Sequence, residues 1–257
     1  MSLGTVEFHG VPVRATTPDD ATDELITRAL GGAEPTAYRL VNSYSFALAS
    51  RDTDYMEVLQ GPGVNLPDGG PLATVLDWSN GDVDCQQVRG PGLFEDCLDA
   101  GRACGVKHFF LGSTPETLAK LVDQARAKFP GVEIAGSWSP PFRALTADEV
   151  AEQDAMLERS GAHVVWVGLG TPKQDVEALR VVSSTGLTAV AVGAAFDFTA
   201  GAKPIAPAWM RATHLEWLFR LATEPRRLWK RYLVGNTQFL VLAARHLREA
   251  RRRTAST

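Results

Sequence analysis

The sequence predicts an α/β protein of the Rossmann-like class, in which a parallel sheet carries helices on both faces and a basic helical appendage follows at the C-terminus. Up to about residue 205, short apolar runs of strand length alternate with longer segments of helical periodicity, as in βαβ units. From about Ala206 the pattern is wholly helical. Residues 201–257 hold 12 Lys and Arg against 3 Asp and Glu, a net charge of +9, whereas residues 1–200 carry −13 and the whole chain −4. We therefore expect a body over residues 1–205 and an appendage over residues 206–257.

Each element is predicted from local signals. The expected strands are apolar runs over residues 36–41, 64–66, 107–112, 132–135, 163–168 and 187–192. Helices begin at capping residues such as Thr17 and Thr114, each followed by a proline and an acidic residue. The expected helices cover residues 17–30, two short segments separated near Asp52, residues 114–128, residues 146–160 and a segment that starts near Gln174.

Two classes of sequence feature are not found. The N-terminus has neither a basic region nor an apolar region of the kind that signal peptides carry. The longest apolar stretch near the end, residues 232–244, is interrupted by polar residues and is shorter than the roughly 20 residues of a membrane-spanning helix. We expect a chain that does not cross a membrane by itself.

The three cysteines have no CxxC spacing. Cys97 and Cys104 lie seven positions apart in a segment expected to be helical, so they would share one helix face two turns apart, too far for a disulfide. All three, Cys85 included, are expected to be small buried apolar residues. This usage fits a reducing cytoplasm.

The ligand site is expected at one edge of the sheet. Ligands of open parallel sheets bind beyond the carboxyl ends of the strands, which here means the loops at Asn42 and at residues 112–114, 168–174 and 193–197. Each loop begins with glycine or asparagine, or carries a helix start whose free N–H groups favour anions. The expected ligand is a phosphate ester.

Several common chemistries are not supported. The chain has no GxGxxG loop and no GxxxxGK[ST] loop, which argues against a dinucleotide-dependent dehydrogenase and a P-loop hydrolase. His108 lies inside one expected strand and His163 precedes another, so both are interpreted as structural. No Ser-His-Asp or Cys-His set is recognisable.

Two acidic pairs resemble metal-binding DxD motifs. Asp52 and Asp54 flank Thr53 at the start of an amphipathic helix, where acidic residues of a first helical turn are common. A metal-binding DxD would instead end an apolar strand. Asp82 and Asp84 lie in a polar loop. A metal-dependent transferase that uses Asp52 and Asp54 is kept as the weakest hypothesis.

Two further carboxylates follow expected strands. Asp68 lies in a turn immediately before an expected helix, where the helix dipole interacts favourably with the ionised carboxylate that a general base needs. The alternative is a plain turn or capping aspartate. Asp197, between two phenylalanines, follows the last strand, and a structural role for it is equally compatible with the sequence.

The basic segment has several interpretations. Arg220, Arg227 and Arg231 are spaced seven and then four positions apart, which on one helix places them on one face. Guanidinium groups arranged in this way can hold a diphosphate. A solvated basic face and an anionic membrane surface are alternatives, and interleaved tryptophans favour the membrane over plain solvation. They are Trp209, Trp217 and Trp229. Nucleic acid is disfavoured because the body, with a net charge of −13, would repel it.

The motifs taken together resemble glycosyltransferase family 26, from about Val6 to Phe239. That family comprises the N-acetylmannosaminyltransferases of wall teichoic acid and enterobacterial common antigen, with related capsule and exopolysaccharide enzymes. The resemblance is carried by Val41-Asn42, Leu66-Pro67-Asp68-Gly69, Val88-Arg89-Gly90, Gly168-Leu169-Gly170-Thr171-Pro172-Lys173-Gln174-Asp175, Val192-Gly193-Ala194-Ala195-Phe196-Asp197-Phe198 and residues 214–232. Several long motifs in the same order are far more specific than any one of them.

The resemblance implies an inverting transfer of sugar from a UDP-sugar to a polyprenyl-diphosphate-linked sugar, without a metal or other cofactor. It makes Asp68 the base that deprotonates the acceptor hydroxyl, and it places Asn42 and Gln174 in the sugar-nucleotide pocket. Arg220 and Arg227 would close over the site and neutralise the leaving diphosphate. The full set expected to bind substrate is Asn42, Arg89, Gly112, Ser113, Gly168, Pro172, Lys173, Gln174, Asp197, Arg220, Arg227, Lys230 and Arg231.

The expected partners follow from the same resemblance. They are UDP-N-acetylmannosamine or a related UDP-hexose, a polyprenyl-diphosphate-linked acceptor and the inner face of the cell membrane, to which a cytoplasmic protein would bind peripherally. No nucleic acid is expected, and the family also allows a homo-oligomer.

Four positions depart from the family pattern. Leu40 replaces a threonine, Gly92 an aspartate and Ile205 an arginine, and Lys230 stands where some members have a third appendage arginine. These changes leave the donor sugar open. They also motivate an alternative of a different class, a catalytically idle UDP-sugar-binding protein that regulates or scaffolds a polysaccharide assembly complex.

Overall fold

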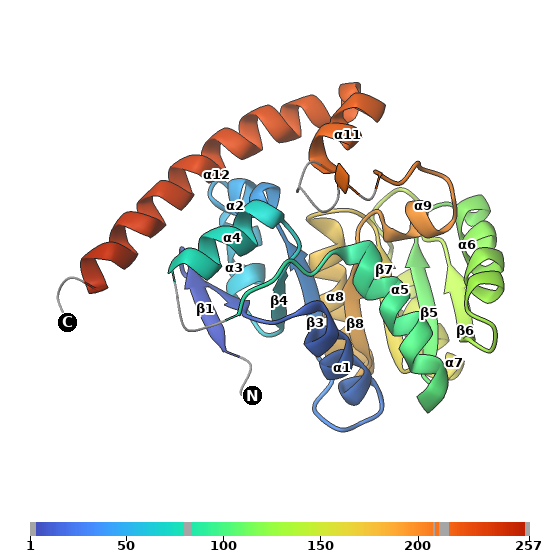
Figure 1. The fold of residues 1–257 in the computed structure, drawn as a ribbon. Helices are drawn as coiled ribbons and strands as arrows, with labels where there is room; N and C mark the ends of the chain where they lie inside the picture. The colour runs from blue at the N-terminus through green and yellow to red at the C-terminus, as the bar shows by residue number, and fades with distance from the viewer. Residues whose placement is uncertain (1–3, 80–83, 208, 211–215, 255–257) are drawn as a thin grey trace.

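The computed structural model describes residues 4–79, 84–207, 209–210 and 216–254 (Figure 1). Six strands form one parallel sheet in the order β4-β3-β8-β7-β5-β6. Their bounds are β3 Ala37–Val41, β4 Val64–Pro67, β5 Lys107–Gly112, β6 Glu133–Trp138, β7 Val164–Gly168 and β8 Thr188–Ala191. The predicted Rossmann-like parallel sheet is confirmed, with β6 ending three residues later than expected.

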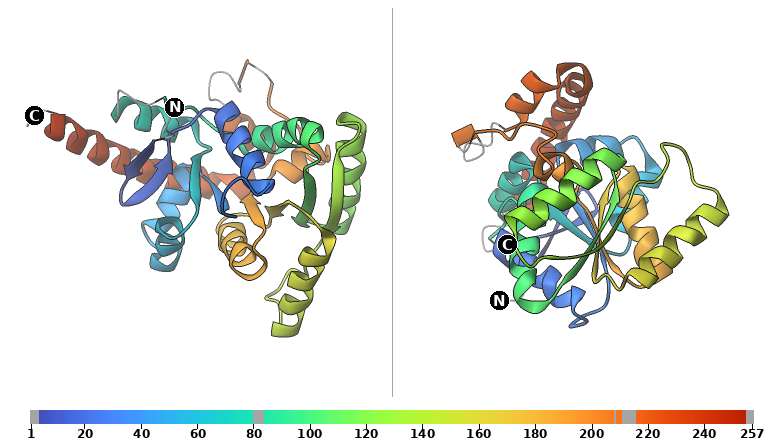
Figure 2. Two further views of the ribbon diagram at one scale, coloured as in Figure 1. Left: turned by 90° about the horizontal axis from the view of Figure 1, so that it is seen from below. Right: turned by 90° about the vertical axis from the view of Figure 1, so that its right-hand side faces the viewer.

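Helices cover both faces of the sheet (Figure 2). The helices α1 Pro18–Ala29, α5 Gly90–Ala100 and α6 Pro115–Lys128 pack with the short α9 Ala195–Thr199 in one apolar cluster against the sheet. The helices α7 Ala147–Ser160 and α8 Lys173–Thr185 pack in a second cluster whose sheet residues alternate with those of the first. The alternation follows because successive strand residues point to opposite faces.

The predicted capping signals are present. Thr17 Oγ1 accepts a hydrogen bond from the backbone N–H of Asp20, and Thr114 Oγ1 accepts one from that of Thr117. Both helices therefore begin where the sequence places them, because each threonine satisfies an N–H group that the first helical turn leaves free.

One expected helix ends earlier than predicted. Helix α5 stops at Ala100, a 3₁₀ turn covers Gly101–Cys104, and Gly105 follows with a left-handed φ of 68°. Cys97 is buried on α5, but Cys104 is exposed on the 3₁₀ turn. The prediction of one shared helix face, and of burial for Cys104, is wrong because the glycines interrupt the helix.

A hairpin of β1 Thr5–Phe8 and β2 Val11–Arg14 forms a separate antiparallel sheet that was not predicted. Its turn, His9-Gly10, has φ values of 50° and 79°, as a two-residue hairpin turn requires. The hairpin packs in a third apolar cluster with α2 Ser43–Ala49, α3 Thr53–Gln60 and α4 Gly70–Ser79.

The basic segment contains two described helices, α11 Glu216–Thr223 and α12 Pro225–Thr254. Helix α12 lies along α2 and α4 (Figure 1) and buries Phe239 and Ala243 in the third cluster. The expectation that Arg220 shares one helix with Arg227 and Arg231 is wrong, because the helix is interrupted at Glu224. The break follows from Pro225, which disfavours a helical conformation of the preceding residue. Over the described residues, no helix is long and apolar enough to cross a membrane.

Candidate active site

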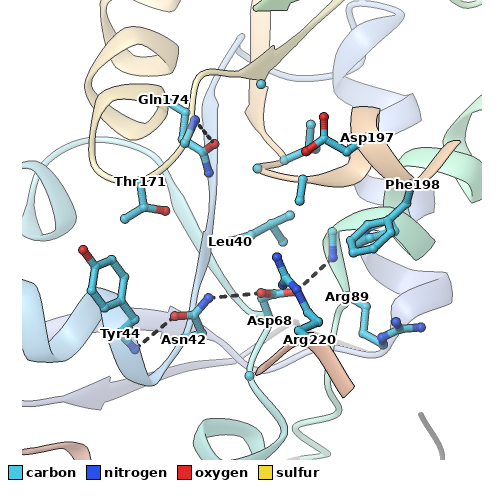
Figure 3. Close-up of a pocket in the computed structure, with 18 of the residues that line it drawn as sticks. Leu40, Asn42, Tyr44, Asp68, Arg89, Thr171, Gln174, Asp197, Phe198 and Arg220 are labelled. Carbon is cyan, nitrogen blue, oxygen red and sulfur yellow. Dashed lines mark hydrogen bonds between the residues drawn. The ribbon is translucent and has the colours of Figure 1, made fainter. Parts of the chain in front are cut away.

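A cavity of about 510 Å³ lies at the carboxyl ends of the strands (Figure 3). The loops that follow β3, β4, β5, β7 and β8 line it, and α11 and α12 contribute side chains from the other side. This is the edge of the sheet where the sequence places the ligand. The cavity brings together these residues of the expected set: Asn42, Asp68, Arg89, Ser113, Gly168, Gln174, Asp197 and Arg220.

Asp68 follows β4 directly and is held by its backbone and its side chain. Its N–H donates to the carbonyl of Val41 at 2.9 Å. Its Oδ1 accepts from the backbone N–H of Gly90, the first residue of α5, at 3.0 Å. Its Oδ2 accepts from Asn42 Nδ2 at 3.2 Å. Each oxygen therefore keeps one lone pair free of these contacts, and the carboxylate is fixed at the cavity wall.

The Asn42 side chain is itself oriented by the start of α2. Asn42 Oδ1 accepts from the backbone N–H groups of Tyr44 and Ser45, and Ser45 Oγ accepts from the Asn42 N–H. This capping box directs the amide nitrogen of Asn42 towards Asp68. In this structure Asn42 thus positions the carboxylate as well as lining the cavity.

The loops after β5 and β7 approach each other closely. Gly112 has a φ of 123°, and a Cβ there would stand 2.6 Å from the carbonyl oxygen of Gly168. Ser113, with a φ of 60°, donates its N–H to the same oxygen at 3.2 Å. Gly112 is buried and does not line the cavity. The structure shows that Gly112 allows the loops to pack and that Ser113 lines the cavity, while substrate contact by Gly112 stays a prediction.

At the start of α8, Gln174 lines the cavity, whereas the two residues before it do not. Gln174 is buried, and its Oε1 accepts from the Gly170 N–H at 3.0 Å. Pro172 precedes the first turn of α8 and Lys173 is exposed at its start. Neither of these two lines the cavity. Their contact with the donor stays a prediction, and the structure shows only that Lys173 is exposed at the start of α8.

Asp197 lies on α9 and not at the strand end that the sequence suggested. Its Oδ2 is 2.6 Å from Lys203 Nζ, which also lies 3.4 Å from Glu224 Oε1 between α11 and α12. Asp197 therefore combines the two readings that the sequence left open, since it lines the cavity and forms a structural ion pair.

Arg220 enters the cavity from α11. Its Nε is buried without a hydrogen-bond partner, and its Cζ lies 5.4 Å from the centroid of the Phe198 ring. A buried N–H group without a partner is unfavourable by about 1–3 kcal/mol, so this group favours an acceptor that enters the cavity. Arg227, Lys230 and Arg231 belong to α12, but their side chains lie outside the described part of the structure.

Sequence reasoning missed several residues that line the cavity. The most exposed is Phe142 in the loop between β6 and α7, with an exposed fraction of 88%. Its two preceding prolines and its apolar ring in a polar loop were the available signal. Others of this kind are Tyr44, Gln87, Thr171, Phe198, Trp217 and Asn236. Asn236 carries no signal in the sequence, because only the packing of α12 brings it to the site.

The acidic pair at the start of α3 has a local role. Asp52 Oδ1 accepts from the Tyr55 N–H at 3.0 Å and caps the helix, while Asp54 lies exposed in its first turn. Neither residue lines the cavity, so the interpretation as acids of a first helical turn is confirmed. Asp82 lies outside the described residues, and within them no group of three or more His, Cys, Asp or Glu side chains could hold a metal ion.

His108 is a core residue, as predicted. Its Nδ1 accepts a hydrogen bond from Trp166 Nε1 at 3.0 Å, and the side chain is completely buried. Burial first, and then the charge of nearby His163, lower the pKa of His108 to about 4. His163 Nδ1 accepts from the Lys107 N–H at 3.2 Å. The two imidazoles therefore serve the sheet and not the cavity.

Comparison with models of protein families shows to which family the chain belongs. The model described as the glycosyl transferase WecG/TagA/CpsF family matches residues 6–253. The chain belongs to this family. The resemblance seen in the sequence motifs is thereby confirmed, and the protein is a glycosyltransferase.

Two relatives of this WecG/TagA/CpsF member come from Bacillus. Each is named N-acetylglucosaminyldiphosphoundecaprenol N-acetyl-beta-D-mannosaminyltransferase. The Bacillus subtilis (strain 168) protein is 28% identical over 190 residues, which cover 72% of this chain and 70% of the relative. The Bacillus spizizenii protein is 31% identical over 187 residues, with the same two shares.

Proposed function

We propose that this glycosyltransferase transfers a sugar from a UDP-sugar to a sugar linked to a polyprenyl diphosphate, with inversion and without a metal. The observation that carries the proposal is the pairing, in one cavity, of a fixed carboxylate, Asp68, with a buried guanidinium, Arg220, whose Nε lacks a partner. A base and a cationic clamp are the two groups that such a transfer needs.

Asp68 takes the proton in this scheme. The acceptor hydroxyl approaches the carboxylate, gives it the proton and attacks the anomeric carbon from the side opposite to the nucleotide. The bond between that carbon and the diphosphate oxygen breaks, and UDP leaves with the electron pair. Since Asn42 and Gly90 already hold the carboxylate, no rearrangement of Asp68 is needed.

Arg220 stabilises the charge that develops on the leaving diphosphate. A guanidinium placed before the reaction begins gives this stabilisation without reorganisation, which is the role that a divalent ion has in metal-dependent transferases. Arg227, Lys230 and Arg231 are proposed to add to the clamp as the segment over residues 206–257 closes over the site.

The acceptor and the location are proposed from the relatives and from the surface of α12. The names of both Bacillus relatives specify a diphosphoundecaprenol acceptor. On this chain, exposed apolar side chains alternate with exposed arginines along α11 and α12, as expected for a helix that lies on an anionic membrane surface. They are Trp217, Leu218, Trp229, Leu240, Val241, Arg226, Arg245 and Arg248. We propose peripheral binding to the inner face of the cell membrane.

The departures from the family pattern bear on the donor sugar. Leu40 lines the cavity, and its Cδ1 would stand 2.9 Å from a Cβ at Gly90. An apolar side chain thus stands at the wall where the family has a hydroxyl. Gly92 and Ile205 do not line the cavity. The proposed donor is UDP-N-acetylmannosamine or a related UDP-hexose.

The test is an assay of UDP release in EDTA, with a panel of UDP-sugars and a short-chain polyprenyl-diphosphate-GlcNAc acceptor. Acceptor-dependent release with one donor is the expected result. Release that requires a divalent ion would contradict the metal-free mechanism. UDP binding without turnover for every donor and acceptor would favour the idle binding protein.

A further inference from the structure

Lys203 connects the cavity wall to the junction between the last two helices. Its Nζ is 2.6 Å from Asp197 Oδ2 and 3.4 Å from Glu224 Oε1. Asp197 lines the cavity on α9, and Glu224 is the one residue between α11 and α12. All three side chains are about a quarter exposed. The two ion pairs that share Lys203 are therefore less screened by solvent than pairs on the open surface.

Glu224 is tied by its backbone to both helices. Its N–H donates to the carbonyl of Arg220 at 2.9 Å, and its own carbonyl accepts from the Leu228 N–H at 3.0 Å. A restraint on the Glu224 side chain therefore restrains the last turn of α11, which carries Arg220, and the first turn of α12.

Such a restraint stabilises the position of Arg220. Its Nε is buried without a hydrogen-bond partner, and its Cζ lies over the ring of Phe198, the residue next to Asp197 on α9. Because the unsatisfied N–H favours rotation of the guanidinium into water, a further contact between α9 and the C-terminal end of α11 helps to hold the side chain in place. The ion pair through Lys203 is that contact.

We propose that Lys203 is a positioning residue, which holds Glu224 against Asp197 and thereby keeps Arg220 in the cavity, ready for the diphosphate of the donor. The inference rests on the proposed function, since it takes the diphosphate as the ligand of Arg220. Lys203 acts through Arg220 and not on the reacting atoms, so its loss weakens donor binding far more than the proton transfer at Asp68.

The experiment compares Lys203→Met, Lys203→Arg and Glu224→Gln with a matched control, Lys128→Met. Lys128 forms a similar pair with Glu95, at 2.8 Å, on α6 and α5 away from the cavity. Calorimetry measures the Kd of UDP, and steady-state kinetics give the donor KM and kcat. We expect Lys203→Met to weaken UDP binding about three- to tenfold, the effect of a partly buried ion pair, and to lower kcat/KM by at least the same factor, because Arg220 also stabilises the charge on the leaving diphosphate. Lys203→Arg should restore most of the affinity, and Lys128→Met should match the wild type.

Glu224→Gln decides between positioning and simple charge. This variant leaves the Lys203 charge in place and removes a negative charge from the region of the cavity. Attraction of UDP by net charge alone would therefore strengthen binding, whereas loss of the restraint on Arg220 would weaken it. Weaker UDP binding by Glu224→Gln supports the proposal, and equal or tighter binding overturns it.

The wild-type protein separates the two levels of inference. If wild-type protein binds no UDP and releases none from any donor, the proposed function fails. If wild-type protein binds UDP and both Lys203→Met and Glu224→Gln bind it equally well, the function stands and the positioning role of Lys203 is wrong. Melting temperatures equal to that of Lys128→Met would show that the variants are folded.

Discussion

The body and the helices α11 and α12 hold their cavity residues in different ways. Asp68 is fixed by hydrogen bonds to groups of four body residues, Val41, Gly90, Asn42 and Gln87. Arg220 rests on one aromatic ring and on a helix end that Lys203 restrains. The difference indicates a division of labour, in which a rigid sheet edge sets the position of the base and a less constrained helix carries the clamp.

The sheet of the body is also more deeply buried than helix α12. Strands β3, β4, β7 and β8 are buried almost throughout their length. Among its described side chains, helix α12 buries Leu228, Phe239 and Ala243 and leaves Leu240 exposed to 67%. Because local stability follows buried contacts, α11 and α12 should separate from the site more readily than any loop of the sheet edge. That property suits a clamp which admits substrate and closes on it.

The largest expected effect is the loss of turnover when the base in the body, Asp68, is replaced. Asp68→Asn should lower kcat at least ~100-fold, because the amide cannot take the acceptor proton, as for other general bases. The UDP affinity, set by other groups, should change little. Kinetics with calorimetry check both values, with the exposed Asp123→Asn on α6 as the control. Activity within a few-fold of the wild type would remove Asp68 from the mechanism.

The second prediction concerns the clamp on α11 and replaces Arg220 with methionine. This variant should weaken UDP binding about 10- to 100-fold, because it removes a charged hydrogen-bond donor from a partly buried site. The structure of the sheet edge should be unaffected. Calorimetric titration with UDP measures the change, and Arg126→Met, exposed on α6, is the control. If Arg220→Met binds UDP as tightly as the wild type, the clamp does not include Arg220.

His108 tests the rigidity of the body through pH. Burial lowers the pKa of His108 to about 4 from an ordinary value of 6.5. As the pH falls, His108 is therefore protonated in the unfolded chain before it is protonated in the folded protein. The contribution of His108 to stability is complete above pH 6.5 and declines as the pH falls towards 4, by up to about 1.4 kcal/mol per pH unit. Urea unfolding at several pH values should show a shallower decline for His108→Asn. An identical slope for both proteins would contradict the assignment.

The smallest effect concerns an acidic residue of the body outside the cavity. Asp52→Ala should lower the free energy of unfolding by about 1 kcal/mol, the usual effect of losing an N-cap. Transferase activity, in EDTA and with Mg²⁺, should be unchanged. A loss of activity that added metal restores would instead revive the DxD hypothesis.

The candidate site could be predicted in part because strand ends and helix caps are local features. Asn42 and Asp68 follow β3 and β4 directly, and neighbouring parallel strands must bring their carboxyl ends together. The positions of Gly112, Pro172 and Lys173 were less predictable. A loop residue beside a ligand motif can face the cavity, the core or the solvent, and the sequence of the loop does not distinguish these three directions.

Three features could be predicted from the residue order alone: the alternation of strands and helices, the loops that form the site edge, and the split between an acidic body and a basic end. These depend on periodicity, capping and charge, which act over a few residues or simply add up. Three others follow from packing and could be seen in the folded protein alone: Asn236 of α12 reaches the cavity, Arg220 and Arg227 lie on different helices, and Lys203 joins Asp197 to Glu224. Such contacts join residues distant in the chain, so they depend on how whole elements pack and not on the order of neighbouring residues.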